Sequence, residues 1–125
     1  MSNRLLVCGG RTYGVPLDSS DKDEVFRAYV ETDDLTRALG FYHSLHPIDV
    51  LIHGNAKGAD KLAGEWAERK GIKTLVFKAE WKKYGKRAGY LRNTRMLKEG
   101  KPTAVMAFEG GVGTEMMCRI AEDAS

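Results

Sequence analysis

The sequence predicts an α/β fold: a three-layer α/β/α sandwich around a mostly parallel sheet of about four strands. Short apolar runs of strand length recur along the chain, near residues 4–8, 48–52, 73–77 and 104–108. Longer segments with apolar residues at helical spacing lie between them. This alternation implies parallel strands joined by right-handed crossovers, with helices on both faces of the sheet. A chain of 125 residues is sized for one such domain, spanning residues 1–125.

The first two crossovers are expected to be helical. Asp21, with Glu24 three residues later, is typical of a helix start, and Pro47 stops the helix that follows. The polar run from Glu31 to Asp34 predicts a break, so we expect one interrupted helix or two consecutive helices. The second crossover is expected to be a helix over about residues 59–70, because its apolar residues fall on one helical face.

The third crossover is expected to combine a loop with a helix. Residues 78–89 mix lysine and arginine with Trp81 and Tyr84, which predicts a long basic loop of a kind that is often functional. The segment from Tyr90 to Lys98 predicts a helix, with Tyr90, Leu91, Thr94 and Leu97 facing inward. A last helix is expected after the final strand and its glycine-rich loop.

The ends of the predicted strands indicate where a ligand would bind. Three of the four strands run into loops that contain glycine, and the third strand runs into the basic, aromatic loop. Ligands of parallel sheets bind beyond the carboxyl ends of the strands, at the point where the strand order reverses. The sequence therefore predicts a ligand pocket at this edge of the sheet.

The loop after the last strand is the leading candidate for an anion site. Gly110, Gly111 and Gly113 are three glycines in four positions, and a helix-like segment follows at once. Glycine leaves no Cβ between the backbone and a ligand, and a helix start offers unpaired N–H groups. Thr114 would cap the helix or give its hydroxyl to the ligand. The alternative is a plain strand-to-helix turn that uses glycine for its geometry.

Side chains near the other strand ends are further candidates. Arg11 would grip a phosphate or carboxylate through two hydrogen bonds, unless it pairs with a surface acid. His53 would either contact a ligand or be buried with a backbone partner. Lys57 would neutralise a phosphate, although a solvated lysine is the commoner case. Trp81 or Tyr84 would stack on a base.

Charge and cysteine content limit the classes of function. A net charge of +3 is mildly basic and does not by itself argue for nucleic acid. No apolar run approaches the length of a membrane span, and no signal-peptide pattern opens the chain. Cys8 and Cys118 have apolar neighbours and no metal-ligand spacing. We therefore expect a cytoplasmic protein with reduced thiols, no structural metal and no cofactor.

An ordered set of short motifs resembles a known family. The motifs are Gly9-Gly10-Arg11, His53 to Asp60, Ala79-Glu80-Trp81 with Tyr84-Gly85, Ala88-Gly89 with Arg92-Asn93 and Met96, and Phe108 with Gly110 to Thr114. Over nearly the whole chain they are similar to the YspA/YpsA-related branch of the SLOG superfamily, common in bacteria and phages. The resemblance implies a Rossmann-like fold that binds nucleotides or nucleotide-derived ligands. Relatives include the Lonely Guy phosphoribohydrolases and the DNA-processing protein DprA.

The sequence departs from these relatives in two ways. The Lonely Guy motif is Pro-Gly-Gly-x-Gly-Thr-x-x-Glu, with a catalytic glutamate, whereas here Glu109 replaces the proline and Met117 stands in place of the glutamate. Glu115 would point elsewhere on the helix, while Arg92 matches the family's arginine. The family pattern usually adds a strand after the last helix, and this sequence ends before one. We therefore expect a sheet edge that is unprotected or covered by a second subunit.

The function we expect first is binding of a nucleotide or nucleotide-derived ligand, with Arg11 and Arg92 as counter-charges. The alternative is an N-glycosidic hydrolase of a nucleoside monophosphate, a reaction that needs a carboxylate near the ribose. The candidates for this carboxylate are Glu115, Glu80 and Asp60. The predicted catalytic residues are Arg92 and Glu115. A second alternative, DprA-like binding of single-stranded DNA, would expect a larger basic stripe than +3 supplies. The predicted ligand-binding residues are Gly9, Gly10, Arg11, His53, Gly54, Gly58, Asp60, Trp81, Tyr84, Arg92, Asn93, Gly110, Gly111, Gly113 and Thr114.

We also expect a homodimer or a larger even-numbered assembly, and no membrane partner. Lonely Guy relatives are dimers, and Met116, Met117 and Ile120 form an apolar group on the last helix. The interface would use that helix, the helix from Tyr90 to Lys98, or both. The alternative is that these apolar side chains pack on their own sheet and leave a monomer.

Overall fold

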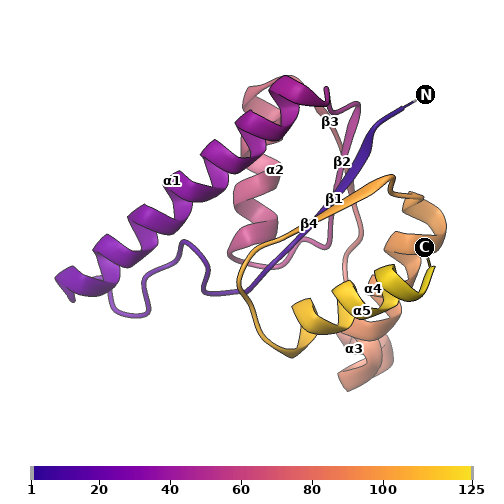
Figure 1. Ribbon diagram of the computed structural model, residues 1–125. Helices are drawn as coiled ribbons and strands as arrows, with labels where there is room; N and C mark the ends of the chain where they lie inside the picture. Colours follow the sequence, from indigo (N-terminus) through magenta and orange to yellow (C-terminus); the bar gives the residue numbers. More distant parts are fainter. Residues whose placement is uncertain (1, 125) are drawn as a thin grey trace.

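The predicted strands form one sheet in the computed structural model, which describes residues 2–124 (Figure 1). They are β1 (Arg4–Cys8), β2 (Val50–His53), β3 (Lys73–Val76) and β4 (Ala104–Ala107). The strand order is β3-β2-β1-β4, and each neighbouring pair is parallel. The α/β fold with a parallel sheet is therefore confirmed, and the expected strand bounds shift by two residues at most.

Helices cover both faces of this sheet. α1 and α2 lie together on one face, and α4 and α5 lie on the other, with α3 at the end of that second layer (Figure 1). The elements between the strands are α1 (Lys22–Leu45), α2 (Ala59–Arg69), α3 (Trp81–Tyr84), the 3-10 turn η1 (Gly85–Arg87), α4 (Ala88–Gly100) and α5 (Val112–Ala124). No helix in the described part of the chain has the length and apolar character needed to cross a membrane.

The core divides into two clusters, one on each face of the sheet. On β1, Leu5 and Val7 pack with α1 and α2, whereas Leu6 and Cys8 pack with α4 and α5. This division follows from the strand, because successive side chains point to opposite faces. β1 is buried on both faces, as expected for the interior strand of a parallel sheet.

The expected break in the first crossover is wrong, since α1 runs uninterrupted through residues 31–34. The polar residues there are held by ion pairs at helical spacing, Arg27 with Glu31 and Arg37 with Asp33. Asp21 caps this helix as predicted, accepting hydrogen bonds from backbone amides in the first turn.

The expected long loop over residues 78–89 is also wrong in part, because it contains α3, η1 and the first residues of α4. The inner face of α4 differs from the prediction in part, although Leu97 packs against the core as expected. Asn93 and Met96 are buried, whereas Tyr90 is half exposed.

The apolar residues of the last helix pack at least partly on their own sheet. Met117 is buried in the cluster beneath α5, and Ile120 packs against the same cluster. The expected dimer interface stays a prediction.

Candidate functional site

The strand order reverses between β1 and β4. The chain leaves β1 for β2 and β3 on one side and returns to add β4 on the other. A cavity of about 490 Å³ lies beyond the carboxyl ends of these two strands. It is lined by Cys8, Gly9, Gly10, Arg11, Ala56, Asp60, Trp81, Lys86, Gly89, Tyr90, Arg92, Asn93, Met96, Gly111, Gly113, Thr114, Met116 and Met117.

The glycines after β1 and β2 bring backbone segments into direct contact. The Gly10 amide donates to the Glu109 carbonyl at 3.0 Å, and the Gly10 carbonyl accepts from the Ala59 amide at 3.3 Å. A Cβ on Gly9 would lie 2.5 Å from the Cβ of Ala59. Gly58 has a φ of +81°, and a Cβ there would overlap the carbonyl oxygen of Gly10. Close packing at these glycines holds the loops together; Gly9 and Gly10 line the cavity, and Gly58 lies behind its wall.

The glycines after β4 are not all alike. Gly110 is tightly packed, because a Cβ there would overlap the Thr114 hydroxyl and lie 2.6 Å from the Gly10 nitrogen. At Gly111 and Gly113 an added Cβ would meet no atom within 4 Å. The Gly111 carbonyl accepts from the Glu115 amide at 3.1 Å, so α5 begins directly at this loop. The start of α5 therefore faces open space, where unpaired N–H groups are available to an anion.

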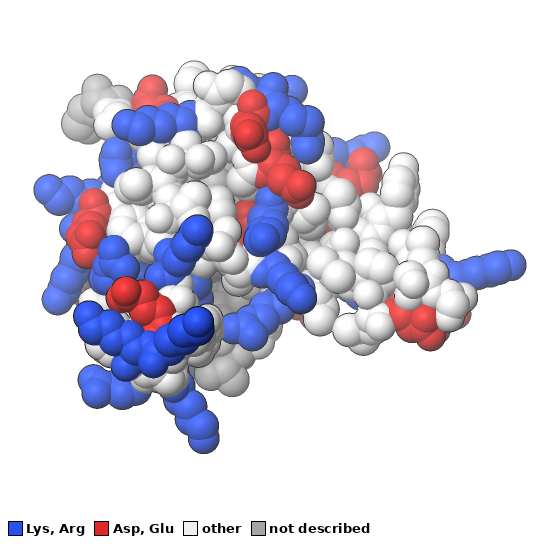
Figure 2. All heavy atoms as spheres, turned by 180° about the vertical axis from the view of Figure 1, so that it is seen from behind, with Lys and Arg blue, Asp and Glu red and all other residues white. Residues whose placement is uncertain are grey.

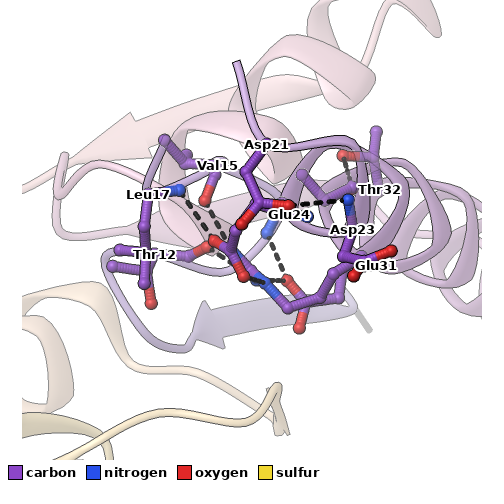
Figure 3. Close-up of polar contacts among 11 residues, drawn as sticks. Thr12, Val15, Leu17, Asp21, Asp23, Glu24, Glu31 and Thr32 are labelled. Atoms are coloured by element: carbon purple, nitrogen blue, oxygen red, sulfur yellow. Dashed lines mark hydrogen bonds and ion pairs between the residues drawn. The ribbon is translucent and has the colours of Figure 1, made fainter. Parts of the chain in front are cut away.

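A clamp on α1 fastens the loop that follows Arg11 (Figure 3). The Arg27 guanidinium donates to the carbonyl oxygens of Thr12, at 3.3 Å, and Val15, at 2.7 Å. It is held between Glu24 and Glu31, and those carboxylates also accept backbone amides of the loop, from Leu17 and Gly14, at 2.8 Å each. This clamp was not among the expected contacts, although Arg27 stands three and four residues from Glu24 and Glu31 in the sequence.

Arg92 joins α4 to the loop after β2. Its Nη1 donates to the Gly54 carbonyl at 2.6 Å, and its Nε donates to the Asn93 side chain at 2.9 Å. Burial is the main cause that lowers the pKa of Arg92, and the nearby charge of Arg11 lowers it further, while Asp60 opposes both. Two guanidinium groups thus repel each other across one cavity, an arrangement that an anion between them would stabilise.

Asp60 is the one carboxylate that lines the cavity within residues 2–124. Its Oδ2 accepts from the amides of Gly54, at 2.9 Å, and Ala56, at 3.3 Å. Burial raises the pKa of Asp60, although the two backbone hydrogen bonds and Arg92 oppose the rise. Asp60 thereby fixes the loop that Arg92 also contacts.

An aromatic ring and a further cation form the rim. The Arg11 guanidinium lies 5.5 Å from the centroid of the Trp81 ring, and about half of Trp81 is exposed. Lys86 also lines the cavity, although it is not among the predicted ligand-binding residues. Its position depends on the turn η1, which was predicted as loop.

Several predicted ligand-binding residues do not line the cavity. His53 is buried: its Nδ1 accepts from the Asn55 amide at 3.0 Å, and a Cβ on Gly64 would lie 2.6 Å from its Nε2. Burial lowers the pKa of His53 to about 4, so the ring is neutral at pH 7. Of the two expectations for this histidine, the structure shows the buried one with a backbone partner.

Other predicted site residues also lie outside the cavity. Gly54 and Gly58 lie behind the cavity wall as loop-packing residues, as does Gly110. Tyr84 lines a separate groove between α3 and α4. Glu115 lines a shallow hollow on the other side of α5 together with Glu109. Met117, in the position of the Lonely Guy glutamate, lines the cavity but is only 1% exposed.

Comparisons with known proteins agree with the motifs. Gene 61 protein of Mycobacterium phage D29 is 38% identical over 82 residues, which cover 60% of this chain and 65% of that protein. The chain thus matches just under two thirds of that relative's length. No solved structure matches. The model of the YspA, cpYpsA-related SLOG family matches residues 3–84, a range that ends before Arg92 and the loop after β4. Since this match covers well over half of the sequence, the chain belongs to the YspA, cpYpsA-related SLOG family.

Proposed function

We propose that the cavity at the end of β1 and β4 binds a nucleotide or nucleotide-derived ligand by its phosphate groups. The observation that carries this proposal is the convergence of Arg11, Lys86 and Arg92 on a cavity that holds a single described carboxylate, Asp60. Membership of the SLOG family supports a nucleotide-related function at the level of the family.

The phosphates would sit at the start of α5. The open Gly111 and Gly113 allow a phosphate to approach the backbone, and the helix start carries partial positive charge. Arg11 and Arg92 would flank the anion. Arg92 donates two hydrogen bonds to the protein, which hold its guanidinium in place and leave other N–H donors for the ligand.

The rest of the ligand would extend toward Trp81. The cavity volume of about 490 Å³ lies within the range of sites for small molecules, roughly 300–1,000 Å³. Trp81 offers an aromatic face at the rim, where Arg11 now covers the ring. Any of the nucleobases could stack on this ring, because each has a flat π-face.

A single substitution at Gly111 tests the proposal. A Cβ on Gly111 would meet no atom within 4 Å, so the fold is expected to survive Gly111→Leu, whose side chain would occupy space at the start of α5. Titration calorimetry with AMP, ADP, ATP and GMP should show binding by the parent and a loss of about tenfold or more in the variant, the cost of a displaced phosphate contact. Gly40→Leu is the matched control, because Gly40 also has no neighbour within 4 Å and lies on α1. Equal binding by all three proteins would mean that the loop is only a turn.

Of the three candidate carboxylates for the hydrolase alternative, Asp60 is the one that lines the cavity, because Glu115 and Glu80 do not. Asp60 already accepts two backbone hydrogen bonds, and Met117 cannot stabilise positive charge. We therefore expect no release of free adenine from AMP at typical enzyme rates, on the order of 1 s⁻¹ or more. Release that disappears in Asp60→Asn would instead establish the hydrolase.

A further inference from the structure

The positive charge of this protein is concentrated in one segment. Residues 78–98 contain eight Lys and Arg but one acidic residue, whereas the rest of the chain contains 12 Lys and Arg against 16 Asp and Glu. That segment forms α3, η1 and most of α4. Figure 2 shows Lys and Arg side chains gathered at the lower left of the view, over these elements. The net charge of +3 is therefore the sum of a strongly basic segment and a remainder with more acidic than basic residues.

This basic surface is grooved, and many of its charges are unpaired. A hollow of about 560 Å³ lies between α3 and α4. Its charged lining residues are five cations, Lys78, Arg87, Arg92, Arg95 and Lys98, and two carboxylates, Glu80 and Glu99. Arg95 pairs with Glu99 at 3.1 Å. Within residues 2–124, no carboxylate forms a salt bridge with Lys78, Arg87 or Lys98. Unpaired cations along a groove attract an extended anion.

Exposed aromatic rings lie among these cations. Trp81, Tyr84 and Tyr90 are each about 40 to 50% exposed, and the Lys83 ammonium lies 5.2 Å from the centroid of the Tyr84 ring. Rings of this kind form stacking platforms for unpaired bases, while neighbouring cations contact the backbone. A membrane surface would supply the negative charge but nothing for the rings to stack on.

We propose that the surface of α3, η1 and α4 binds a single-stranded nucleic acid. The phosphates lie along Lys78, Lys82, Arg87 and Lys98, and bases stack on Tyr84. Trp81, Lys86, Tyr90 and Arg92 of the same elements line the nucleotide cavity, whereas the side chains that carry this proposal, Lys78, Lys82, Tyr84, Arg87 and Lys98, do not. The proposal therefore does not depend on what the cavity binds.

Fluorescence anisotropy with a labelled oligothymidine of about 12 nucleotides, a length in the usual range of site sizes, tests the proposal. The parent should bind at low salt, and the logarithm of its affinity should fall with the logarithm of salt concentration with a slope of about −2 to −3, as for three or four phosphate contacts on a single strand. Lys78→Gln, Lys82→Gln and Arg87→Gln combined should lower affinity by about tenfold or more and flatten that slope.

A charge-matched control removes the same number of exposed cations from the opposite layer: Lys22→Gln, Arg69→Gln and Lys70→Gln, on and beside α1 and α2. This control should bind as the parent does. Equal losses in both triple variants would reduce the effect to net charge and overturn the proposal. The proposal would also be overturned if the parent bound no oligonucleotide at low salt, or if it bound vesicles of anionic lipid instead.

Two further variants test whether bases stack on Tyr84 and whether oligonucleotide binding is independent of the nucleotide cavity. Tyr84→Ala should weaken oligothymidine about tenfold, with a smaller effect on a duplex of the same length, because paired bases are not open to stacking. Equal affinity for duplex and single strand would contradict the single-stranded assignment. Gly111→Leu should leave oligonucleotide binding unchanged, so failure of this proposal and failure of nucleotide binding in the cavity are distinguishable.

Discussion

Two groups of glycines meet at the carboxyl edge of the sheet, and they have different roles. Gly10 and Gly58 are packed against backbone atoms of neighbouring loops, and a Cβ at either position would collide with them. Gly111 and Gly113, at the start of α5, face open space. The first group lets the loops approach one another, and only the second leaves room for a ligand. A glycine-rich loop after a strand is therefore not by itself a phosphate site.

The largest expected effect is on the packed side, in Gly58→Ala. The added Cβ would overlap the Gly10 carbonyl oxygen and lie 2.7 Å from that of Arg11, at a φ of +81°. Backbone strain costs about 1–3 kcal/mol, and overpacking costs about as much again. We expect urea denaturation to show a loss of roughly 3 kcal/mol or more, a large part of a typical stability of about 5–15 kcal/mol.

Gly71→Ala separates the two causes. Gly71 has a φ of +71° but no atom within 4 Å of an added Cβ, so only the strain remains and the expected loss is about 1 kcal/mol. Similar losses at the two positions would show that the loops are not closely packed, and the contrast between the two glycine groups would fail.

Local patterns predicted the fold, but contacts between distant segments decided the site. The apolar runs gave the strands and, with the motifs, the Rossmann-like fold. The break expected over residues 31–34 was a misjudgement of local evidence, because Arg27 and Arg37 stand at ion-pairing distance along a helix from Glu31 and Asp33. By contrast, the packed role of Gly58 and the place of Lys86 at the cavity depend on how separate loops cross, which no single segment encodes.

Buried His53, on the packed side of the sheet edge, is expected to make the stability of the protein depend on pH. Its pKa is about 4 in the folded state, against an ordinary value of 6.5. As pH falls from 6.5 to 4, the unfolded chain takes up a proton that the folded protein excludes, so stability is lost over that window, by up to about 3 kcal/mol. The raised pKa of Asp60 acts in the opposite direction, because the folded state then binds its proton more readily.

A comparison with His53→Asn isolates the histidine. The asparagine oxygen can accept the Asn55 amide as Nδ1 does, but it does not titrate. The free energy of unfolding, measured at several pH values between 4 and 7, should fall more steeply with acidification in the parent than in the variant. Parallel curves would mean that His53 titrates normally, as a ligand-facing histidine would.

The smallest expected effect on stability is on the open side, in Gly113→Ala. Gly113 lies in the first turn of α5 and has no atom within 4 Å of an added Cβ, so alanine should be accommodated without strain. Because glycine is the poorer helix former, the variant should gain between zero and about 1 kcal/mol of stability. The same methyl group would project beside the proposed phosphate position, so nucleotide affinity should fall several-fold while stability does not. Thermal unfolding and calorimetry on one protein sample measure both quantities. A variant that loses stability would place Gly113 among the packed glycines, and one that gains stability with unchanged affinity would move the phosphate away from the start of α5.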